Sequence, residues 1–588
     1  MHIMTLLSRR LPISLLRSHA LFLLCVVLFQ ILSSDQKFPQ IFHHPHPHAL
    51  LSTLQPPPPR RTDHGTQAAA GVAGGAAAAA SPPAAAPAAV PAKGDDSEIE
   101  SGDEEEEGEA DVFSPPEVVP PLAGTAAPAQ VPPDGPVMAE QWGPPVFDMR
   151  KVLLGNVHDG PGLRPDFPHL TSEEKRDRLT LFLVCLPMAF METTIIPATN
   201  ANLMASYHAP MSKGEFLRWL GIALLMSCYP GIERDDCFTP GARDKEAPIP
   251  DFRHLMGRNR FRAITQCLAL QSAALIAAEA QRDRFIQVRG FIEAWCQNME
   301  RKFNPGWRVC LDESMVAWLE RWTCPGWMNL PRKPHPFGNQ YHTIACGLTH
   351  VIFKLELVEG KDRPAHRPLP EFEAEHGKTC SLILRMTQPL FAPGRVVIMD
   401  SAFCQLRAIV QLFKRGLFAT SAIKKRRYWP MHIDGAALDA KLADSPMGTA
   451  VARCGQMADV PFQLLAVRDS KHVLKLVSTY GTLERGEKEK RRYIASTKTH
   501  VEFKYPKVVE DYYATRHAVD DNNNIRQGSA SLEANFLLKS WEKRQFLALT
   551  AISEANALAF FSYQQGQTQE NEPFSLANFR RKLAKALI

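Results

Sequence analysis

Two short apolar runs in this chain are each tied to an aspartate. Asp312 lies in WRVCLDESMVAW, and Asp400 ends the run GRVVIMD. The length and the β-branched content of these runs predict buried strands that close on an acidic residue. A third aspartate, Asp520, lies in the polar, helical stretch YYATRHAVDDNNN. Two strand ends and one helix that bring carboxylates to a single point can hold two divalent metal ions, and such a site cuts and rejoins phosphodiester bonds.

The segments around these aspartates predict an α/β core over residues 291–540. The segment 341–360, YHTIACGLTHVIFKLELVEG, has the pattern of a hairpin, and LFATSAI at 417–423 has that of a further strand. Amphipathic helices are expected in TCSLILRMTQPLF and AFCQLRAIVQLFKRG. The resulting order of three strands, then helix, strand, helix and strand is typical of a ribonuclease-H-like domain.

Residues 430–500 predict a β-rich insertion in this core. Short apolar runs such as FQLLAVRD alternate there with polar turns. The charged run RGEKEKRR at 485–492 is expected to be a solvated turn of the insertion.

Helical periodicity dominates on both sides of the predicted core. Residues 166–290 predict a helical domain, and residues 541–588 predict a C-terminal helix with a basic tail. Trp541, Phe546 and Leu549 are expected in the hydrophobic core.

Residues 1–165 predict a disordered, low-complexity region. They contain Pro- and Ala-rich tracts and the acidic run 95–111, with too few large apolar residues to offset the chain entropy. The apolar run 20–32 follows several arginines and has the length of a signal-peptide core. An extended gene model or an incidental apolar tail explains the same run. We expect a nuclear protein without a membrane span, with an N-terminal targeting segment as the alternative.

Charge is unevenly spread along the chain. Residues 1–111 carry 7 Lys and Arg against 13 Asp and Glu, a net charge of −6. Because the whole chain has a net charge of +5, residues 112–588 carry +11. A basic body favours nucleic acid as a partner, although a solvated surface explains it equally well. The 12 cysteines form no CxxC pair, which argues against a zinc module and a dense disulfide framework.

The clearest candidate for contact with DNA follows the last predicted strand of the core. Four cations can contact phosphates and two aromatic rings can stack on bases, whereas a solvated loop is the alternative. These residues are Lys424, Lys425, Arg426, Arg427, Tyr428 and Trp429. The tail residues 580–582 and 585 could contact phosphate, serve nuclear import or be incidental.

The three aspartates fit a magnesium site by donor type. Mg²⁺ prefers hard oxygen ligands, which carboxylates supply. Asp312 and Asp400 are expected to bridge one ion and Asp520 to complete the second, with Asp521 as the fallback ligand. Glu313 should point to the opposite face of its strand. Taken alone, Asp312 and Asp400 would more often be turn formers at strand ends, and Asp520 a solvated helix residue.

Seven segments, in register over about 170–565, resemble the piggyBac transposase family and its transposable-element-derived relatives. EFLRWLGIALLMSCYPGIERDDCF and MGRNRF are similar to elements of the family's helical region. PGWRVCLDESMVAW, RKPHPFGNQY and VVIMDSAFCQLRAIVQLFKRGLFATSAIKKRRYWP resemble its core elements. RDSKHVLKLVST is similar to a strand pair, and YYATRHAVDDNN lies where the family carries its third aspartate.

The resemblance implies a DDE/D transposase with a ribonuclease-H-like core. It also implies that the helical domain at 166–290 serves dimerisation and DNA binding. It places the catalytic aspartates on Asp312, Asp400 and Asp520, and it implies two Mg²⁺ or Mn²⁺ ions. It also implies cleavage at transposon ends, DNA hairpin intermediates and TTAA target sites. Double-stranded DNA and a second copy of the chain are the expected partners, and no small-molecule substrate is expected. Lys333, in RKPHPFGNQY, joins the residues expected to contact DNA.

The chain departs from the family pattern close to the predicted site. Asn523 stands where the family has a fourth acid, Ser401 replaces an asparagine, and Lys424 replaces an arginine. The family's cysteine-rich C-terminal zinc domain is absent from this sequence. A neutral amide is a poorer ligand for a hard cation than a carboxylate. A domesticated or inactive descendant that binds DNA without catalysis is therefore the alternative.

Overall fold

The computed structural model describes most of the chain beyond residue 176. The expectations for residues 1–161 of the disordered region, for the apolar run 20–32 and for residues 424–429 fall outside the described residues. The structure describes residues 162–163, 173–174, 177–239, 250–360, 370–392, 394–423, 435–458, 460–469, 472–481, 484–494, 498–568 and 575–588.

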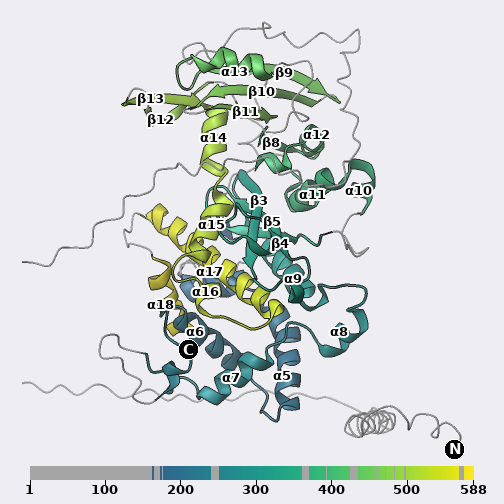
Figure 1. The fold of residues 1–588 in the computed structure, drawn as a ribbon, viewed down its shortest axis with the longest axis vertical. Helices are drawn as coiled ribbons and strands as arrows, with labels where there is room; N and C mark the ends of the chain where they lie inside the picture. Colours follow the sequence, from purple (N-terminus) through teal and green to yellow (C-terminus); the bar gives the residue numbers. More distant parts are fainter. Residues whose placement is uncertain are drawn as a thin grey trace, which may run out of the picture. The chain divides into compact units, whose positions relative to one another are not determined.

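One large mixed sheet forms the core of the described chain (Figure 1). The strand order is β4-β5-β3-β7-β8-β11-β10-β9, and β6 pairs with β5. The hairpin strands β5 and β6 are antiparallel to their neighbours, whereas β3, β7 and β8 run parallel. The strands are β3 (Arg308–Ala317), β4 (Met328–Asn329), β5 (Phe337–Cys346), β6 (Ile352–Leu357), β7 (Arg395–Met399), β8 (Leu417–Ala422), β9 (Ala450–Met457), β10 (Val460–Arg468) and β11 (Val473–Ser478).

The order β6-β5-β3-β7-β8 confirms the predicted ribonuclease-H-like α/β core. The strands β7 and β8 are buried almost throughout, as expected for central parallel strands that are covered on both faces. Helix α11 (Lys378–Thr387) precedes β7, and helix α12 (Leu406–Lys414) connects β7 to β8 and packs on β8. A strand, a helix and a parallel strand in succession form the βαβ unit that the sequence pattern indicates.

The segment 430–500 extends the same sheet. Strand β11 pairs antiparallel with β8, and β10 and β9 continue outward from it. Helix α13 (Gly435–Ala443) precedes these strands. The charged run 485–492, expected as a turn, instead forms most of β12 (Arg485–Ile494), which pairs with β13 (Thr499–Pro506) in a separate two-stranded sheet. The prediction was wrong because backbone pairing with β13 stabilises a strand whose side chains are mostly exposed.

The segments before and after the core are helical and pack together. The early helices are α3 (Arg178–Cys185), α4 (Met188–Phe190), α5 (Ile196–Ala205), α6 (Lys213–Met226), α7 (Arg258–Cys267), α8 (Ala273–Glu279) and α9 (Ile286–Lys302). The late helices are α14 (Lys507–Thr515), α15 (Ala518–Gln527), α16 (Leu532–Asn535), α17 (Trp541–Thr568) and α18 (Leu576–Leu587). The remaining short elements include β1 (Gly162–Leu163), β2 (Phe303–Asn304) and α10 (Pro370–His376).

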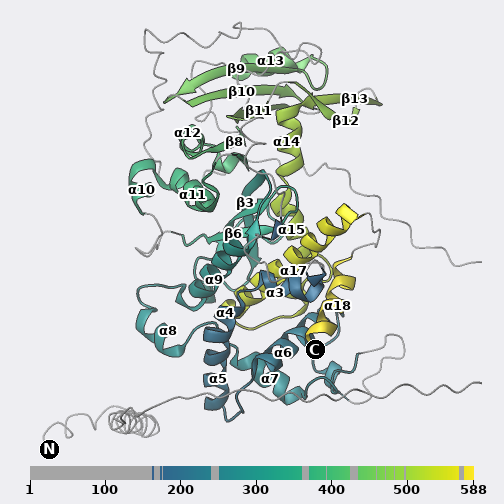
Figure 2. The same ribbon diagram turned by 180° about the vertical axis from the view of Figure 1, so that it is seen from behind.

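Helix α17 connects the early helices to the sheet (Figure 2). Trp295 of α9 donates its Nε1 hydrogen to Ser553 Oγ at 2.9 Å, and Tyr341 of β5 donates to Gln545 Oε1 at 2.7 Å. Phe546 and Leu549 are fully buried, which confirms their predicted place in the core. Buried side chains from Leu181 to Leu587 thus share one large hydrophobic cluster, and a second, smaller cluster lies among β7, β8, β10, β11 and α14 of the described chain.

By length and composition, the segment Trp541–Gln564 of α17 could cross a membrane. Within the described chain, the bent pair Arg178–Cys185 and Met188–Ala205 also passes this test when it is taken as one span. The apolar window of α17 is 89% buried inside the protein, as expected for a core helix.

Candidate active site

Asp312 lies at the point where the parallel ladder between β3 and β7 ends. The last pair of this ladder is Leu311 with Met399. The expectation that Asp312 closes its strand was wrong, because β3 continues to Ala317 through antiparallel pairing with β5. The side chain remains partly exposed, and its Oδ1 accepts a hydrogen bond from the Glu313 backbone N–H at 2.8 Å.

Asp400 follows β7 directly and is exposed. It precedes the short 3₁₀ turn Ser401–Phe403. The Ser401 hydroxyl donates to Asp400 Oδ2 at 3.4 Å, and the Ser421 hydroxyl of β8 donates to the Asp400 carbonyl at 3.3 Å. Because Met399 is the partner of Leu311 across the parallel ladder, the next residues on these adjacent strands, Asp400 and Asp312, lie at the same level.

Asp520 lies in the first turn of α15, which packs against β3 and β5. Two contacts hold the far end of this helix against β3. The buried Arg526 donates to the Met315 carbonyl at 2.9 Å, and Gln527 donates to the same oxygen at 3.1 Å. At the near end, the Cys310 thiol donates to the Arg516 carbonyl at 3.3 Å. The helix therefore carries Asp520 to the edge where Asp312 lies.

The three carboxylates lie within electrostatic range of one another. Burial among protein atoms, followed by the charge of Asp520 and to a lesser extent that of Asp400, holds the pKa of Asp312 well above its usual range. Burial also raises the pKa of Asp520, with the nearby Lys333 and His517 acting in the opposite direction. An acidic cluster of this kind favours a bound cation, because a cation relieves both the burial cost and the repulsion.

Lys333, named from the resemblance as a contact to DNA, lies beside this cluster, a position that no local sequence pattern indicates. Its Nζ is 3.8 Å from Glu313 Oε2. Burial alone would lower the pKa of Lys333, but the charges of Asp312, Glu313 and Asp520 outweigh burial and raise it. The ammonium group therefore acts as a countercharge to the carboxylates.

Asp521 and Asn523, two other residues of α15 named from the sequence, each contact another side chain. Asp521 Oδ2 is 3.3 Å from His350 Nδ1. Asn523 Oδ1 accepts a hydrogen bond from Arg526 Nη2 at 3.1 Å. The position of the family's fourth acid is thus occupied by an amide that binds a buried arginine.

The aspartate cluster fits a hard divalent cation by donor type, because Asp312, Asp400 and Asp520 all offer carboxylate oxygens. Lys333 leaves most of their negative charge uncompensated. In the described part of the chain, however, no three His, Cys, Asp or Glu side chains already converge as a set of metal ligands. The aspartate side chains would therefore have to turn towards one another to bind one ion jointly.

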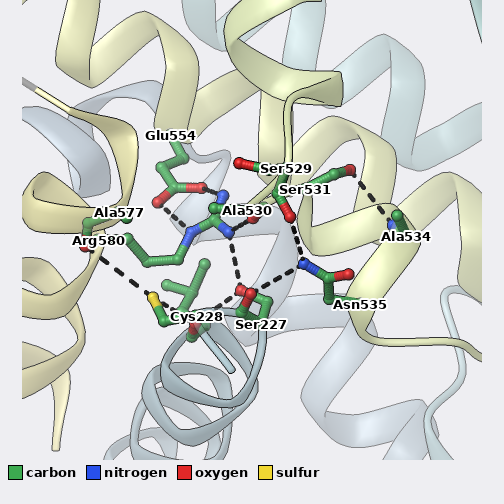
Figure 3. A network of polar contacts seen from close by, with 11 residues as sticks. Ser227, Cys228, Ser529, Ala530, Ser531, Ala534, Asn535, Glu554, Ala577 and Arg580 are labelled. Carbon is green, nitrogen blue, oxygen red and sulfur yellow. Dashed lines mark hydrogen bonds and ion pairs between the residues drawn. The ribbon is translucent and has the colours of Figure 1, made fainter. Parts of the chain in front are cut away.

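Of the basic residues named in the tail, Arg580 is buried and does not face solvent (Figure 3). Its guanidinium forms a two-pronged ion pair with Glu554 of α17, and both side chains are 1% exposed. It also donates to Ser227 Oγ at 2.8 Å and to the Ala530 carbonyl. Arg580 therefore fixes α18 to α17 and to the end of α6, so of the alternatives open for the tail cations, phosphate contact does not suit this buried side chain.

The strand order and the helix that carries Asp520 define a ribonuclease-H-like domain with an acidic edge. The family model Transposase IS4 matches residues 179–558, more than half of the chain. The chain therefore belongs to the Transposase IS4 family.

Similarity to a solved structure agrees with this assignment at the level of the fold. The chain is similar to a piggyBac transposase in a cryo-EM structure of its synaptic complex with hairpin DNA. The TM-score is 0.53 at 17% sequence identity, over 73% of this chain and 82% of that one. A search of curated protein sequences gives no significant match.

Proposed function

We propose that this protein is a piggyBac-like DNA transposase. Its active site, formed by Asp312, Asp400 and Asp520, would cut and rejoin DNA strands. The observation that carries the proposal is the pairing of Leu311 with Met399. It sets Asp312 and Asp400 on neighbouring strands at one level, and α15 adds Asp520. Membership of a transposase family supports the reaction class.

The three aspartates would hold two Mg²⁺ or Mn²⁺ ions. When bound, such ions activate the attacking oxygen and stabilise the leaving oxygen of a phosphodiester. The protein's own part is to supply the carboxylates from a rigid sheet and a packed helix. Lys333 balances part of their charge until the metal and the DNA arrive.

Double-stranded DNA is the proposed partner. The similar solved structure is a complex with hairpin DNA, which supports this choice. The basic balance of residues 112–588 supports it as well. A homodimer and a nuclear location complete the proposal, with residues 424–429 as further contacts to DNA.

Metal-dependent cleavage tests the proposal. The full chain is incubated with Mg²⁺ or Mn²⁺ and with DNA from both sides of its gene, chosen for matching inverted repeats. We expect nicks at the repeat ends, no cleavage with EDTA, and loss of cleavage in Asp400→Asn. The matched control is Asp251→Asn, at an exposed aspartate of the helical region, which should cleave normally. Equal cleavage by the wild type and Asp400→Asn would contradict the assignment.

A DNA-binding descendant of a transposable element, without catalysis, is the second candidate. It is favoured by the amide at Asn523 and by the lack of a ready set of metal ligands among the described side chains. It predicts salt-dependent DNA binding that Asp400→Asn leaves unchanged. Neutralising Lys424, Lys425, Arg426 and Arg427 should remove this binding.

A further inference from the structure

The segment 318–336 joins β3 to β5 and presents two large apolar side chains to solvent. We refer to it as the aromatic loop. Leu319 is 81% exposed and Trp322 is 91% exposed. The Arg321 guanidinium lies 5.4 Å from the centre of the Trp322 ring and 5.8 Å from that of Trp327. Trp327 in turn stacks on Phe337, with the ring centres 5.6 Å apart and the planes at 10°.

The aromatic loop is held in place by hydrogen bonds within it and by one from β5. Trp318 Nε1 donates to Thr323 Oγ1 at 2.9 Å, and Trp327 Nε1 donates to the Trp318 carbonyl at the same distance. Asn339 Nδ2 donates to the Pro325 carbonyl at 2.7 Å. The backbone that carries the exposed Trp322 ring is therefore held in place, so little backbone ordering entropy would be lost when a ligand stacks on the ring.

The position and charge of the aromatic loop indicate what would bind there. Its cations Arg321, Arg332 and Lys333 outnumber its single acid, Glu320. Lys333 also reaches the carboxylate cluster, so one loop connects the exposed tryptophan to the candidate active site. A planar aromatic ring beside cations suits an unpaired base, which offers a flat face and an adjacent phosphate.

We propose that Trp322, backed by Arg321, is a stacking platform for an unpaired nucleotide of the DNA strand at the candidate active site. The proposal rests on the proposed function, because it takes DNA as the partner. It adds a ligand class and a position on the surface. Strand cutting leaves single-stranded nucleotides beside the reacting phosphate, and stacking would hold one of them there.

The experiment measures DNA binding by the full chain with fluorescence anisotropy. The probes are a duplex with a short single-stranded 3′ overhang, the same duplex with abasic sites in the overhang, and a blunt duplex. We expect Trp322→Ala to weaken binding of the overhang duplex by about tenfold. Binding of the blunt and abasic probes should change by less than about twofold. Trp322→Phe should retain most of the affinity, because it keeps a stacking face.

The matched control is Tyr207→Ala, because Tyr207 is another aromatic residue and is 99% exposed. It should leave the binding of all three probes unchanged. Equal effects of Trp322→Ala on the overhang and blunt probes, or no effect on either, would overturn the platform. So would a shift from dimer to monomer in sedimentation with unchanged binding of the overhang, because Trp322 would then be a protein contact.

The failure of the platform can be told apart from the failure of the proposed function. Suppose that the wild type binds and cleaves DNA, but that Trp322→Ala weakens binding of the overhang and blunt probes equally or not at all. Only the platform is then wrong. If the wild type binds none of the probes, the choice of DNA as the partner is wrong, and the platform with it.

Discussion

Asp312 and Asp400 each follow a residue of the last pair in the parallel ladder between β3 and β7, Leu311 and Met399. Beyond this pair the two strands separate, since β3 continues along β5 while β7 gives way to a 3₁₀ turn. The two carboxylates thus lie at the level where the strands diverge. Such a site concentrates negative charge, and the metal-free protein must tolerate that repulsion.

Neutralising Asp312 should stabilise the metal-free protein. The raised pKa of Asp312 means that its ionised form is unfavourable in the folded protein. The fold therefore loses stability as the pH rises through that pKa. With EDTA at neutral pH, we expect Asp312→Asn to raise the free energy of unfolding by on the order of 1 kcal/mol. Urea titrations measure this. The gain should disappear at acidic pH, and a loss of stability at neutral pH would contradict the account.

Gly338 fixes the end of the β3–β5 hairpin next to the aromatic loop. Its φ is +141°, and an added Cβ would lie 2.0 Å from the Val316 carbonyl oxygen. Gly338→Ala should therefore cost at least about 2 kcal/mol of stability, measured by urea unfolding. The control is Gly214→Ala in α6, where only Ser212 Oγ lies within reach at 3.9 Å. That variant should be neutral or slightly stabilising, because alanine favours helix.

The buried pair of Arg580 and Glu554 should respond asymmetrically to substitution. Arg580→Met leaves a buried, uncompensated carboxylate and should cost about 3–5 kcal/mol in urea unfolding. The double variant Arg580→Met with Glu554→Leu removes both charges and should recover most of the loss. Arg581→Met, at the exposed neighbour, is the control. If the double variant is no better than the single one, the hydrogen bonds to Ser227 and Ala530 matter more than the charges.

The ion pair of Glu215 and Arg260 should give a pH-dependent contribution. The two side chains form two hydrogen bonds of 2.7 Å, and these lower the pKa of Glu215 from its usual 4.5. A carboxylate with a lowered pKa stabilises the fold at pH values above its pKa in the unfolded chain. This stability is lost as the pH falls through its pKa in the folded protein. Glu215→Gln should cost about 1 kcal/mol at neutral pH and nothing in strong acid.

The control for this pair is Glu192→Gln. Glu192 pairs with Lys213 at 2.6 Å, but both side chains are more than 40% exposed. Thermal unfolding across the pH range should show little effect of this substitution. An equal effect of the two substitutions at neutral pH would show that the burial of the Glu215 pair is immaterial.

Much of the core could be predicted from the sequence because its signals are local. Buried parallel strands have continuous apolar runs, so β7 and β8 are visible in RVVIM and LFATSA. The strand, helix and strand around Asp400 predict parallel pairing. From that pairing follows the expectation that Asp312 and Asp400 lie close together.

Other features depend on contacts that no local pattern records. Asp312 lies in the middle of β3 because pairing with β5 extends the strand. Lys333 reaches the carboxylates only because the aromatic loop folds back on itself. In the sequence, Arg580 looks like an exposed cation of the tail. Its burial depends on an ion pair with Glu554, which lies in the preceding helix, α17. The charged β12 is a strand only because of its partner β13.

Metal binding by the three aspartates is tested most directly with Mn²⁺, whose binding is followed by electron paramagnetic resonance. We expect about two Mn²⁺ ions per wild-type chain, displaced by Mg²⁺. Asp312→Asn, Asp400→Asn and Asp520→Asn should each lose at least one of these ions, while Asp251→Asn binds as the wild type does. Binding that is the same in the wild type and in all three aspartate variants would contradict the account.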